Sequence, residues 1–210
     1  MNVVIFGASR GVGRAAVEIA AARGHAVRAI ARTADALAEL PATTIAGDVL
    51  DPGVAANALT GAEAVLVALG SAPAARDGRQ GKVCSLGTRA ILDAMKAASV
   101  RRVVVVSSYG VGPSRDRPPL AFKVVAATIL KDVMADKELQ ENDVRASATD
   151  WTIVQPLGLT DETGTGRAFV SIDGSPGRTH VSRADVATVC IDAIENRRYL
   201  RETIAVSAED

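Results

Sequence analysis

Hydrophobic and polar positions along this chain alternate between two periodicities. Short, nearly continuous apolar runs predict strands that are buried on both faces, and the segments between them carry apolar residues at helical spacing. The predicted strands cover residues 2–6, 25–31, 43–46, 64–69, 102–106, 151–155 and 202–206. The predicted helices cover residues 15–22, 34–40, 51–59 and 83–98, one or two segments within 120–147, and a helix that Ser182 caps and that runs to about residue 196.

This alternation predicts an α/β fold, a Rossmann-like doubly wound parallel sheet with helices on both faces. We expect residues 1–210 to form one domain, because single domains commonly reach about 250 residues. The segment 156–179 is long and irregular, with a short strand predicted near 168–171. We interpret residues 157–180 as a small substrate-binding lobe. Ligands of such sheets bind at the carboxyl ends of the strands, here between the first and fourth strands.

Composition narrows the class of protein. The chain has 24 Lys and Arg residues and 24 Asp and Glu residues, so no overall field attracts nucleic acid or an anionic membrane. No window of about 18 apolar residues predicts a membrane span. The first residues form a strand rather than a signal peptide, and Cys84 and Cys190 are isolated, which suits a reducing compartment. We therefore expect a cytoplasmic protein, and the isolated His180 predicts no metal site.

The first predicted strand runs directly into a glycine-rich turn with the spacing G-x-x-x-G-x-G. The first glycine allows the tight turn, the second lets the backbone approach a pyrophosphate, and the third lets the following helix pack on the sheet. The N–H groups and the dipole at the start of that helix would hold the phosphates. The alternative is a plain strand-to-helix turn. The predicted phosphate-binding residues are Gly7, Ser9, Arg10, Gly11, Val12 and Gly13.

Two arginines favour NADP(H) over NAD(H). NAD-selective sites usually place Asp or Glu at the end of the second strand, where it binds the ribose hydroxyls. Here Arg32 takes that place, and Arg10 lies within the glycine turn. A guanidinium binds a 2′-phosphate with two hydrogen bonds, whereas a carboxylate would repel it. The alternative is that both arginines are solvated surface charges.

The ends of the third and fourth strands complete the predicted cofactor site. Asp48 is placed to accept a hydrogen bond from the adenine amino group while Val49 packs on the ring; alternatively, Asp48 only initiates the next helix. The fourth strand ends in Leu69, Gly70 and Ser71, where a small residue allows the backbone to pass along the cofactor ribose.

Several segments, in order, resemble one known family: the glycine turn and residues 27–32, 47–49, 102–108, 150–156 and 182–187. They are similar to the atypical short-chain dehydrogenase/reductase proteins with an NAD(P)H-binding domain, which include the biliverdin-IXβ/flavin reductases and the NmrA-like proteins. The turn departs from that family, whose usual spacing is G-x-x-G-x-x-G. The resemblance covers nearly the whole chain and implies a small-molecule substrate and a monomer or homodimer. It identifies no particular substrate.

The resemblance also implies catalytic residues, with one departure. Typical members use Ser, Tyr and Lys, with the Tyr four residues before the Lys; the Tyr transfers a proton, and the Lys lowers the pKa of the Tyr and binds the nicotinamide ribose. Lys137 resembles the family lysine, but Val133 stands four residues before it. Ser108 resembles the serine beside the nicotinamide, with Ser107 before it, and Tyr109 is a candidate stand-in proton donor.

Each catalytic candidate also has a structural interpretation. The serines at 107 and 108 would satisfy backbone groups at the strand end, and the tyrosine at 109 would pack on a pocket rim. Lys137 would pair with Glu141 on a helix surface, as residues four apart can do. Pro156 and Leu157 resemble the family segment that runs past the nicotinamide amide, so we include both in the cofactor site.

The expected function is that of an NADPH-dependent oxidoreductase that transfers hydride to a small conjugated acceptor such as a flavin, quinone or tetrapyrrole. In the flavin reductase-like members a serine assists this transfer without the tyrosine, and solvent protonates the product. One alternative is an NmrA-type redox sensor that binds the cofactor without turnover. A second alternative is a sugar-nucleotide epimerase or dehydratase, which the missing tyrosine and Arg32 disfavour.

Overall fold

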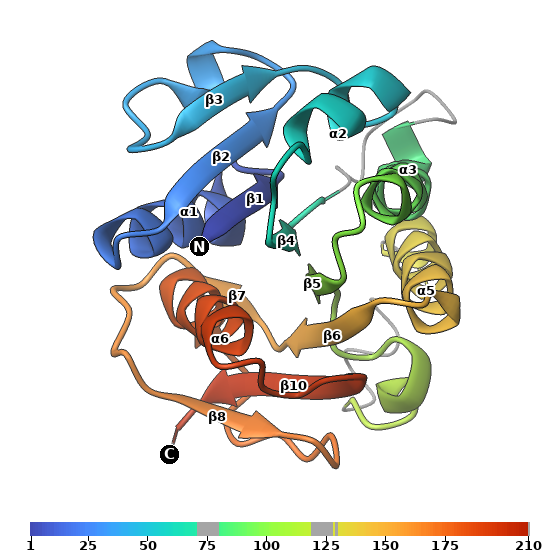
Figure 1. The fold of residues 1–210 in the computed structure, drawn as a ribbon. Coiled ribbons are helices and arrows are strands. Elements are labelled where there is room, and N and C mark those ends of the chain that lie inside the picture. The colour runs from blue at the N-terminus through green and yellow to red at the C-terminus, as the bar shows by residue number, and fades with distance from the viewer. Residues whose placement is uncertain (71–79, 119–127, 129, 210) are drawn as a thin grey trace.

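A computed structural model of the chain describes residues 1–70, 80–118, 128 and 130–209. They form an eight-stranded sheet in the order β3-β2-β1-β4-β5-β6-β10-β8 (Figure 1). The strands are β1 (Asn2–Phe6), β2 (Ala26–Ala31), β3 (Thr43–Ala46), β4 (Ala64–Val67), β5 (Arg102–Val106), β6 (Asp150–Pro156), β8 (Ala168–Ser171) and β10 (Glu202–Ala208). Neighbouring strands are parallel except for β8, which is antiparallel to β10. The predicted Rossmann-like sheet is confirmed.

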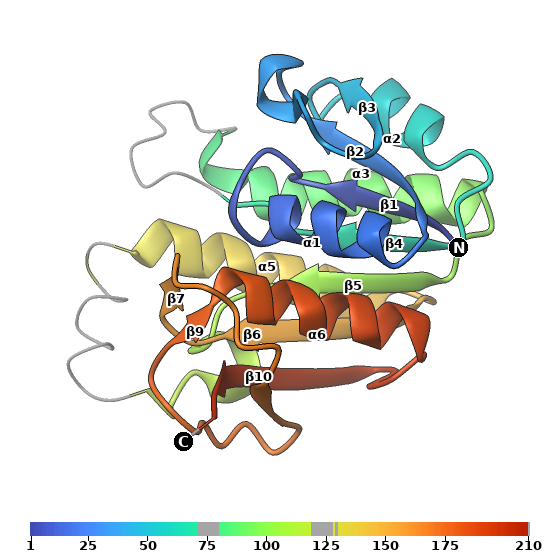
Figure 2. The same cartoon turned by 90° about the vertical axis from the view of Figure 1, so that its left-hand side faces the viewer.

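Helices cover both faces of this sheet (Figures 1 and 2). One face carries α1 (Gly11–Ala22) and α6 (Arg183–Glu195), which pack against each other. The other face carries α2 (Pro52–Ala58), α3 (Val83–Ala97) and α5 (Lys131–Ala146). The central strands are mostly apolar on both faces because alternate side chains enter two separate cores, as Ile5 and Phe6 do on β1.

Two predicted helix starts are confirmed by their caps. Asp51 precedes α2, and its carboxylate accepts a hydrogen bond from the Gly53 N–H at 2.9 Å. Ser182 precedes α6, and its Oγ accepts a hydrogen bond from the Asp185 N–H at 3.0 Å. Each side-chain oxygen satisfies an N–H group that has no acceptor within the helix.

Several predicted boundaries differ from the structure. The helix predicted over residues 34–40 is wrong: this segment forms only a 3₁₀ turn, Asp35–Leu37, because fewer than two helical turns fit before Pro41. Helix α1 begins at Gly11, earlier than predicted, and β4 ends at Val67 rather than at residue 69. The helical prediction over residues 120–147 is confirmed for α5, and its part at 120–127 and 129 lies outside the described residues.

The segment that follows β6 forms the predicted short strand at Ala168–Ser171 and a second, two-stranded sheet. In that sheet β7 (Leu159–Thr160) pairs in parallel with β9 (Val181–Ser182). The buried carboxylate of Asp185 accepts hydrogen bonds from the backbone N–H groups of Thr165 and Gly166 at 3.1 and 2.8 Å. This carboxylate fixes the segment to the start of α6. Across the described part of the chain, the helices are too short or too polar to span a bilayer.

Candidate functional site

The glycine turn joins β1 to α1 by backbone contacts that leave no room for side chains. Gly7 has φ +84°, and a Cβ atom there would stand 2.4 Å from the carbonyl oxygen of Ala68, beyond β4. A Cβ atom on Gly13 would stand 2.2 Å from the carbonyl oxygen of Gly7. Both distances are far below contact, so the tight turn and the close helix packing expected of these glycines are present in the structure.

The start of α1 is left without a side-chain acceptor of its own. Arg10 occupies the capping position in an extended conformation, its side chain makes no capping hydrogen bond, and the first turn carries no acidic residue. Gly11 has φ +58°, and the nearest atoms to a Cβ atom there would belong to the Arg183 side chain rather than to backbone. The first N–H groups of the helix can therefore receive an anion, as a dinucleotide pyrophosphate requires.

Arg10 and Arg32 lie on the carboxyl side of β1 and β2, which pair directly in the sheet. Both are exposed, and neither forms an ion pair with any other described residue. Their guanidinium groups are thus free to bind a phosphate. The role of these two residues in choosing NADP(H) stays a prediction.

The predicted adenine side is tightly packed. Val49 is buried, and a Cβ atom on Gly87 of α3 would stand 2.8 Å from side-chain carbons of both Val49 and Leu69. Asp48 is exposed, and its carboxylate accepts a hydrogen bond from the Leu50 N–H at 3.0 Å, which fixes the loop before α2.

At the end of β4 the described chain stops at Gly70, which is exposed, and Ser71 lies outside the described residues. The cofactor roles assigned to Asp48, Val49, Leu69, Gly70 and Ser71 stay predictions.

The other half of the carboxyl edge is held by side chains from α5. The Lys137 ammonium is buried and donates hydrogen bonds to the carbonyl oxygens of Leu69 at 2.9 Å and Val106 at 2.7 Å, and to Gln140 Oε1 at 3.1 Å. An ammonium group has three N–H donors, so all of them are used. Lys137 therefore ties the ends of β4 and β5 together. The surface pair between Lys137 and Glu141 is wrong, because both side chains are buried and have separate partners.

A second buried cluster surrounds the Glu141 carboxylate. This carboxylate accepts hydrogen bonds from Ser107 Oγ at 2.5 Å, Gln155 Nε2 at 2.8 Å and Arg145 Nη2 at 2.5 Å. Glu141 is completely buried. The cluster fixes the Ser107 hydroxyl at the end of β5, directly before Ser108.

The two remaining catalytic candidates differ in how firmly their hydroxyl groups are hydrogen-bonded. Ser108 is half-buried, and among the described residues its Oγ donates only a long hydrogen bond of 3.3 Å, to the Tyr109 carbonyl oxygen. The Tyr109 hydroxyl donates to the carbonyl oxygen of Gly174 at 2.9 Å, and burial raises the pKa of this phenol. Tyr109 packs against Leu157, and its N–H donates to the Pro156 carbonyl oxygen. The catalytic roles of Ser108 and Tyr109, and the cofactor roles of Pro156 and Leu157, stay predictions.

Sequence reasoning missed most partners of Lys137 and Ser107. The polar residues at positions 136, 137, 140 and 141 share one face of α5, and all four are buried. Asp136 on this face accepts hydrogen bonds from the N–H groups of Cys84 and Ser85 at 2.9 Å each, at the start of α3. The helical spacing of these polar residues was the available signal that α5 turns a polar face inward.

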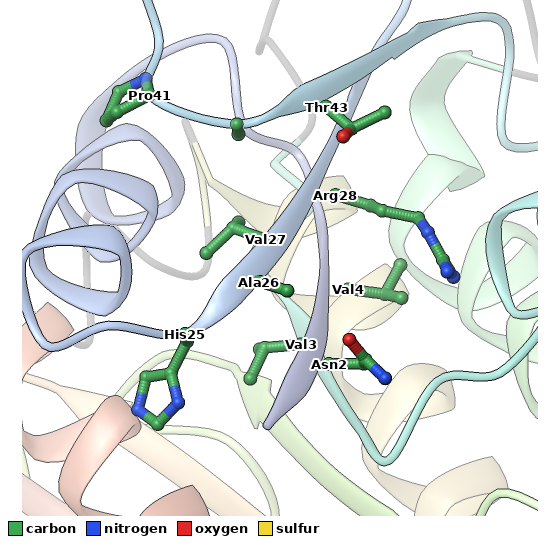
Figure 3. Close-up of a pocket in the computed structure, with 10 residues that line it drawn as sticks. Asn2, Val3, Val4, His25, Ala26, Val27, Arg28, Pro41 and Thr43 are labelled. Atoms are coloured by element: carbon green, nitrogen blue, oxygen red, sulfur yellow. The ribbon is translucent and has the colours of Figure 1, made fainter.

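A cavity of about 420 Å³ lies at the opposite end of the sheet, at the amino ends of β1, β2 and β3 (Figure 3). Figure 3 shows that the side chains of Val27 and Arg28, which line it, point to opposite sides of the sheet. The cavity therefore spreads around the strand ends and holds none of the predicted site residues. Its lining residues are Asn2, Val3, Val4, His25, Ala26, Val27, Arg28, Pro41, Ala42 and Thr43.

Comparisons with known proteins agree with the interpretation of the glycine turn as a dinucleotide-binding turn. The model of a family described as NAD(P)H-binding matches residues 7–197. The UPF0659 protein C216.03 of Schizosaccharomyces pombe is 29% identical over 126 residues, which cover 53% of this chain and 48%, about half, of that relative. The uncharacterized protein YwnB of Bacillus subtilis is 27% identical over 100% of this chain and 99% of its own.

Among solved structures, one neighbour is similar along its whole length. ChuY of Escherichia coli O157:H7, described as an anaerobilin reductase, has a TM-score of 0.84 and 27% sequence identity. The match covers 100% of this chain and 98% of the ChuY chain. The fold and the order of its elements are therefore shared with a protein of known reductase type.

Proposed function

The chain belongs to the NAD(P)H-binding family, and within it we propose an NADPH-dependent reductase that transfers hydride to a small conjugated acceptor. The observation that carries this proposal is the uncapped start of α1, at the same edge of the sheet as Arg10 and Arg32, which form no ion pair within the described part of the chain. The three glycines permit the backbone approach, the helix start takes the pyrophosphate, and the arginines take the 2′-phosphate.

Bound NADPH supplies the hydride, and the residues at the end of β5 hold the acceptor in our proposal. Ser108 donates a hydrogen bond to the acceptor in this step, because among the described residues its hydroxyl has only the long hydrogen bond to the Tyr109 carbonyl oxygen. Ser107 and Lys137 act as positioning residues, since their polar atoms are bound to Glu141 and to the ends of β4 and β5.

A conjugated acceptor suits this set of residues. The Tyr109 hydroxyl is bound to Gly174 and its pKa is raised by burial, so it is a poor proton donor at neutral pH. Flavins, quinones and tetrapyrroles delocalise the added electron pair and can take their proton from solvent. The similarity to ChuY, described as an anaerobilin reductase, supports the inclusion of bilins in this class.

The test follows nicotinamide absorbance while the purified protein is mixed with NADPH and with FMN, a quinone or biliverdin. We expect oxidation of NADPH with at least one acceptor, and slower turnover by about tenfold or more in Ser108→Ala at unchanged NADPH affinity. Ser108→Thr, which keeps a hydroxyl, is the matched control and should retain activity. Tight NADPH binding without oxidation by any acceptor would instead indicate a redox sensor.

A further inference from the structure

Arg183, the first residue of α6, reaches across to the start of α1. A Cβ atom on Gly11 would stand 3.3 Å from Arg183 Cδ and 3.4 Å from Arg183 Nε. The two helices run side by side on one face of the sheet (Figure 2). The Arg183 side chain therefore lies against the part of the glycine turn whose N–H groups are open to an anion.

The present partner of Arg183 is an exposed carboxylate. Arg183 Nη1 donates to Asp161 Oδ1 at 2.8 Å, and the two side chains are 31% and 89% exposed. This contact uses one of the five N–H donors of the guanidinium group. An ion pair this exposed adds little stability, so a stronger acceptor can replace it at small cost.

Asp161 follows β7 in the segment that Asp185 fixes through the backbone N–H groups of Thr165 and Gly166. Asp161 is therefore held near Arg183 by contacts that do not depend on their ion pair. Its carboxylate places a negative charge beside the helix start that the proposed function assigns to phosphate.

We propose that Arg183 binds the cofactor pyrophosphate, and that Asp161 competes with the pyrophosphate for this arginine. The inference rests on the proposed function, because it needs a dinucleotide at the glycine turn. A pyrophosphate carries more charge than a carboxylate and can accept two parallel hydrogen bonds from the guanidinium fork. The helix N-terminus and Arg183 would then hold the same group, and Asp161 would set the affinity for every ligand with a pyrophosphate.

Isothermal titration calorimetry of four ligands tests this assignment. NADPH, NADH and ADP-ribose contain the pyrophosphate, whereas adenosine 2′-monophosphate has no phosphate at the 5′ position. We expect Arg183→Gln to weaken the three pyrophosphate ligands by a similar factor of about ten, the loss of one charge-assisted hydrogen bond, and to leave adenosine 2′-monophosphate unchanged. Asp161→Asn should tighten the same three ligands by about threefold.

The double variant Asp161→Asn with Arg183→Gln separates competition from a structural effect. We expect Asp161→Asn to have a smaller effect on affinity once Arg183 is replaced, since the competition for the guanidinium group is then gone. Equal effects of Asp161→Asn with and without Arg183 would overturn the inference. Equal weakening of adenosine 2′-monophosphate and NADPH by Arg183→Gln would overturn it as well.

Two controls distinguish this inference from the proposed function. Circular dichroism melting curves should coincide for the wild-type protein and both single variants, because an ion pair with so exposed a carboxylate adds little stability. If the folded wild-type protein binds none of the dinucleotides, the proposed function fails and the inference fails with it. If the wild-type protein binds them and Arg183→Gln leaves their affinities unchanged, only the assignment of Arg183 fails.

Discussion

The two halves of the sheet's carboxyl edge are held together in different ways. Around β1 and α1, glycines bring backbone to within contact of backbone, so that a single carbon on Gly13 would meet the Gly7 carbonyl oxygen. Around β5 and β6, buried side chains of α5 make the connections, through Lys137 and Glu141. We call these the glycine half and the side-chain half.

The difference shows which kind of change each half can tolerate. The glycine half is intolerant of added atoms, because it has no free volume, and it contains few polar side chains to lose. The side-chain half is intolerant of removed atoms, because a buried donor or acceptor that loses its partner pays its full desolvation cost.

Removal of the Glu141 side chain should damage the side-chain half most. Glu141→Ala leaves Arg145, Ser107 and Gln155 without their shared acceptor, and we expect a loss of about 3–5 kcal/mol in the free energy of unfolding. Urea unfolding followed by circular dichroism measures it. The matched control is Glu138→Ala on the same helix, whose ion pair with Arg115 is exposed and should contribute less than about 1 kcal/mol. Equal losses in the two variants would contradict the distinction.

Addition of one carbon should damage the glycine half by a smaller amount. In Gly13→Ala the new Cβ atom would stand 2.2 Å from a backbone oxygen, so α1 must shift, and we expect a loss of about 1–3 kcal/mol. The same unfolding measurement applies. Gly81→Ala is the control, because a Cβ atom at Gly81 would meet no atom of the described residues within 4 Å. A Gly13→Ala protein as stable as Gly81→Ala would show that the contact is not tight.

Replacement of Arg32 should change ligand choice and leave the fold intact. Arg32 is exposed at the end of β2, so Arg32→Ala should unfold at the same urea concentration as the wild-type protein. We expect it to weaken NADPH by about tenfold, or about 1.4 kcal/mol, and NADH by less than about twofold, since only NADPH has a 2′-phosphate. Fluorescence titration measures both affinities, with the exposed Arg167→Ala as the control. Equal weakening of the two cofactors would contradict the assignment.

The glycine turn could be predicted from the sequence because its glycines lie close together in the chain, although Gly7 also contacts the distant Ala68. Gly7 and Gly13 lie within a few residues of each other, and the caps Asp51 and Ser182 bind N–H groups two and three residues ahead. The alternation of strands and helices likewise predicted the sheet. The helix predicted over residues 34–40 did not form, although Leu37 is buried, because fewer than two helical turns fit before Pro41.

The side-chain half could not be predicted because its partners are distant in the sequence. Lys137 binds carbonyl groups of Leu69 and Val106, and a spacing of four residues to Glu141 is equally compatible with a surface pair. Arg183 lies in a segment that resembles a family motif, but its contact with Gly11 joins distant parts of the chain and could not be predicted. Such contacts depend on the register and the crossing of elements, which one sequence does not contain.

The polar inner face of α5 also has a consequence for the order in which the chain folds. Two of its buried groups, Lys137 and Glu141, complete their hydrogen bonds only where β4, β5 and β6 end side by side. Desolvation of these groups before the strands pair would leave hydrogen bonds unmade and would be unfavourable. We therefore expect α5 to dock after the sheet has assembled, so that its side chains slow unfolding more than they speed folding.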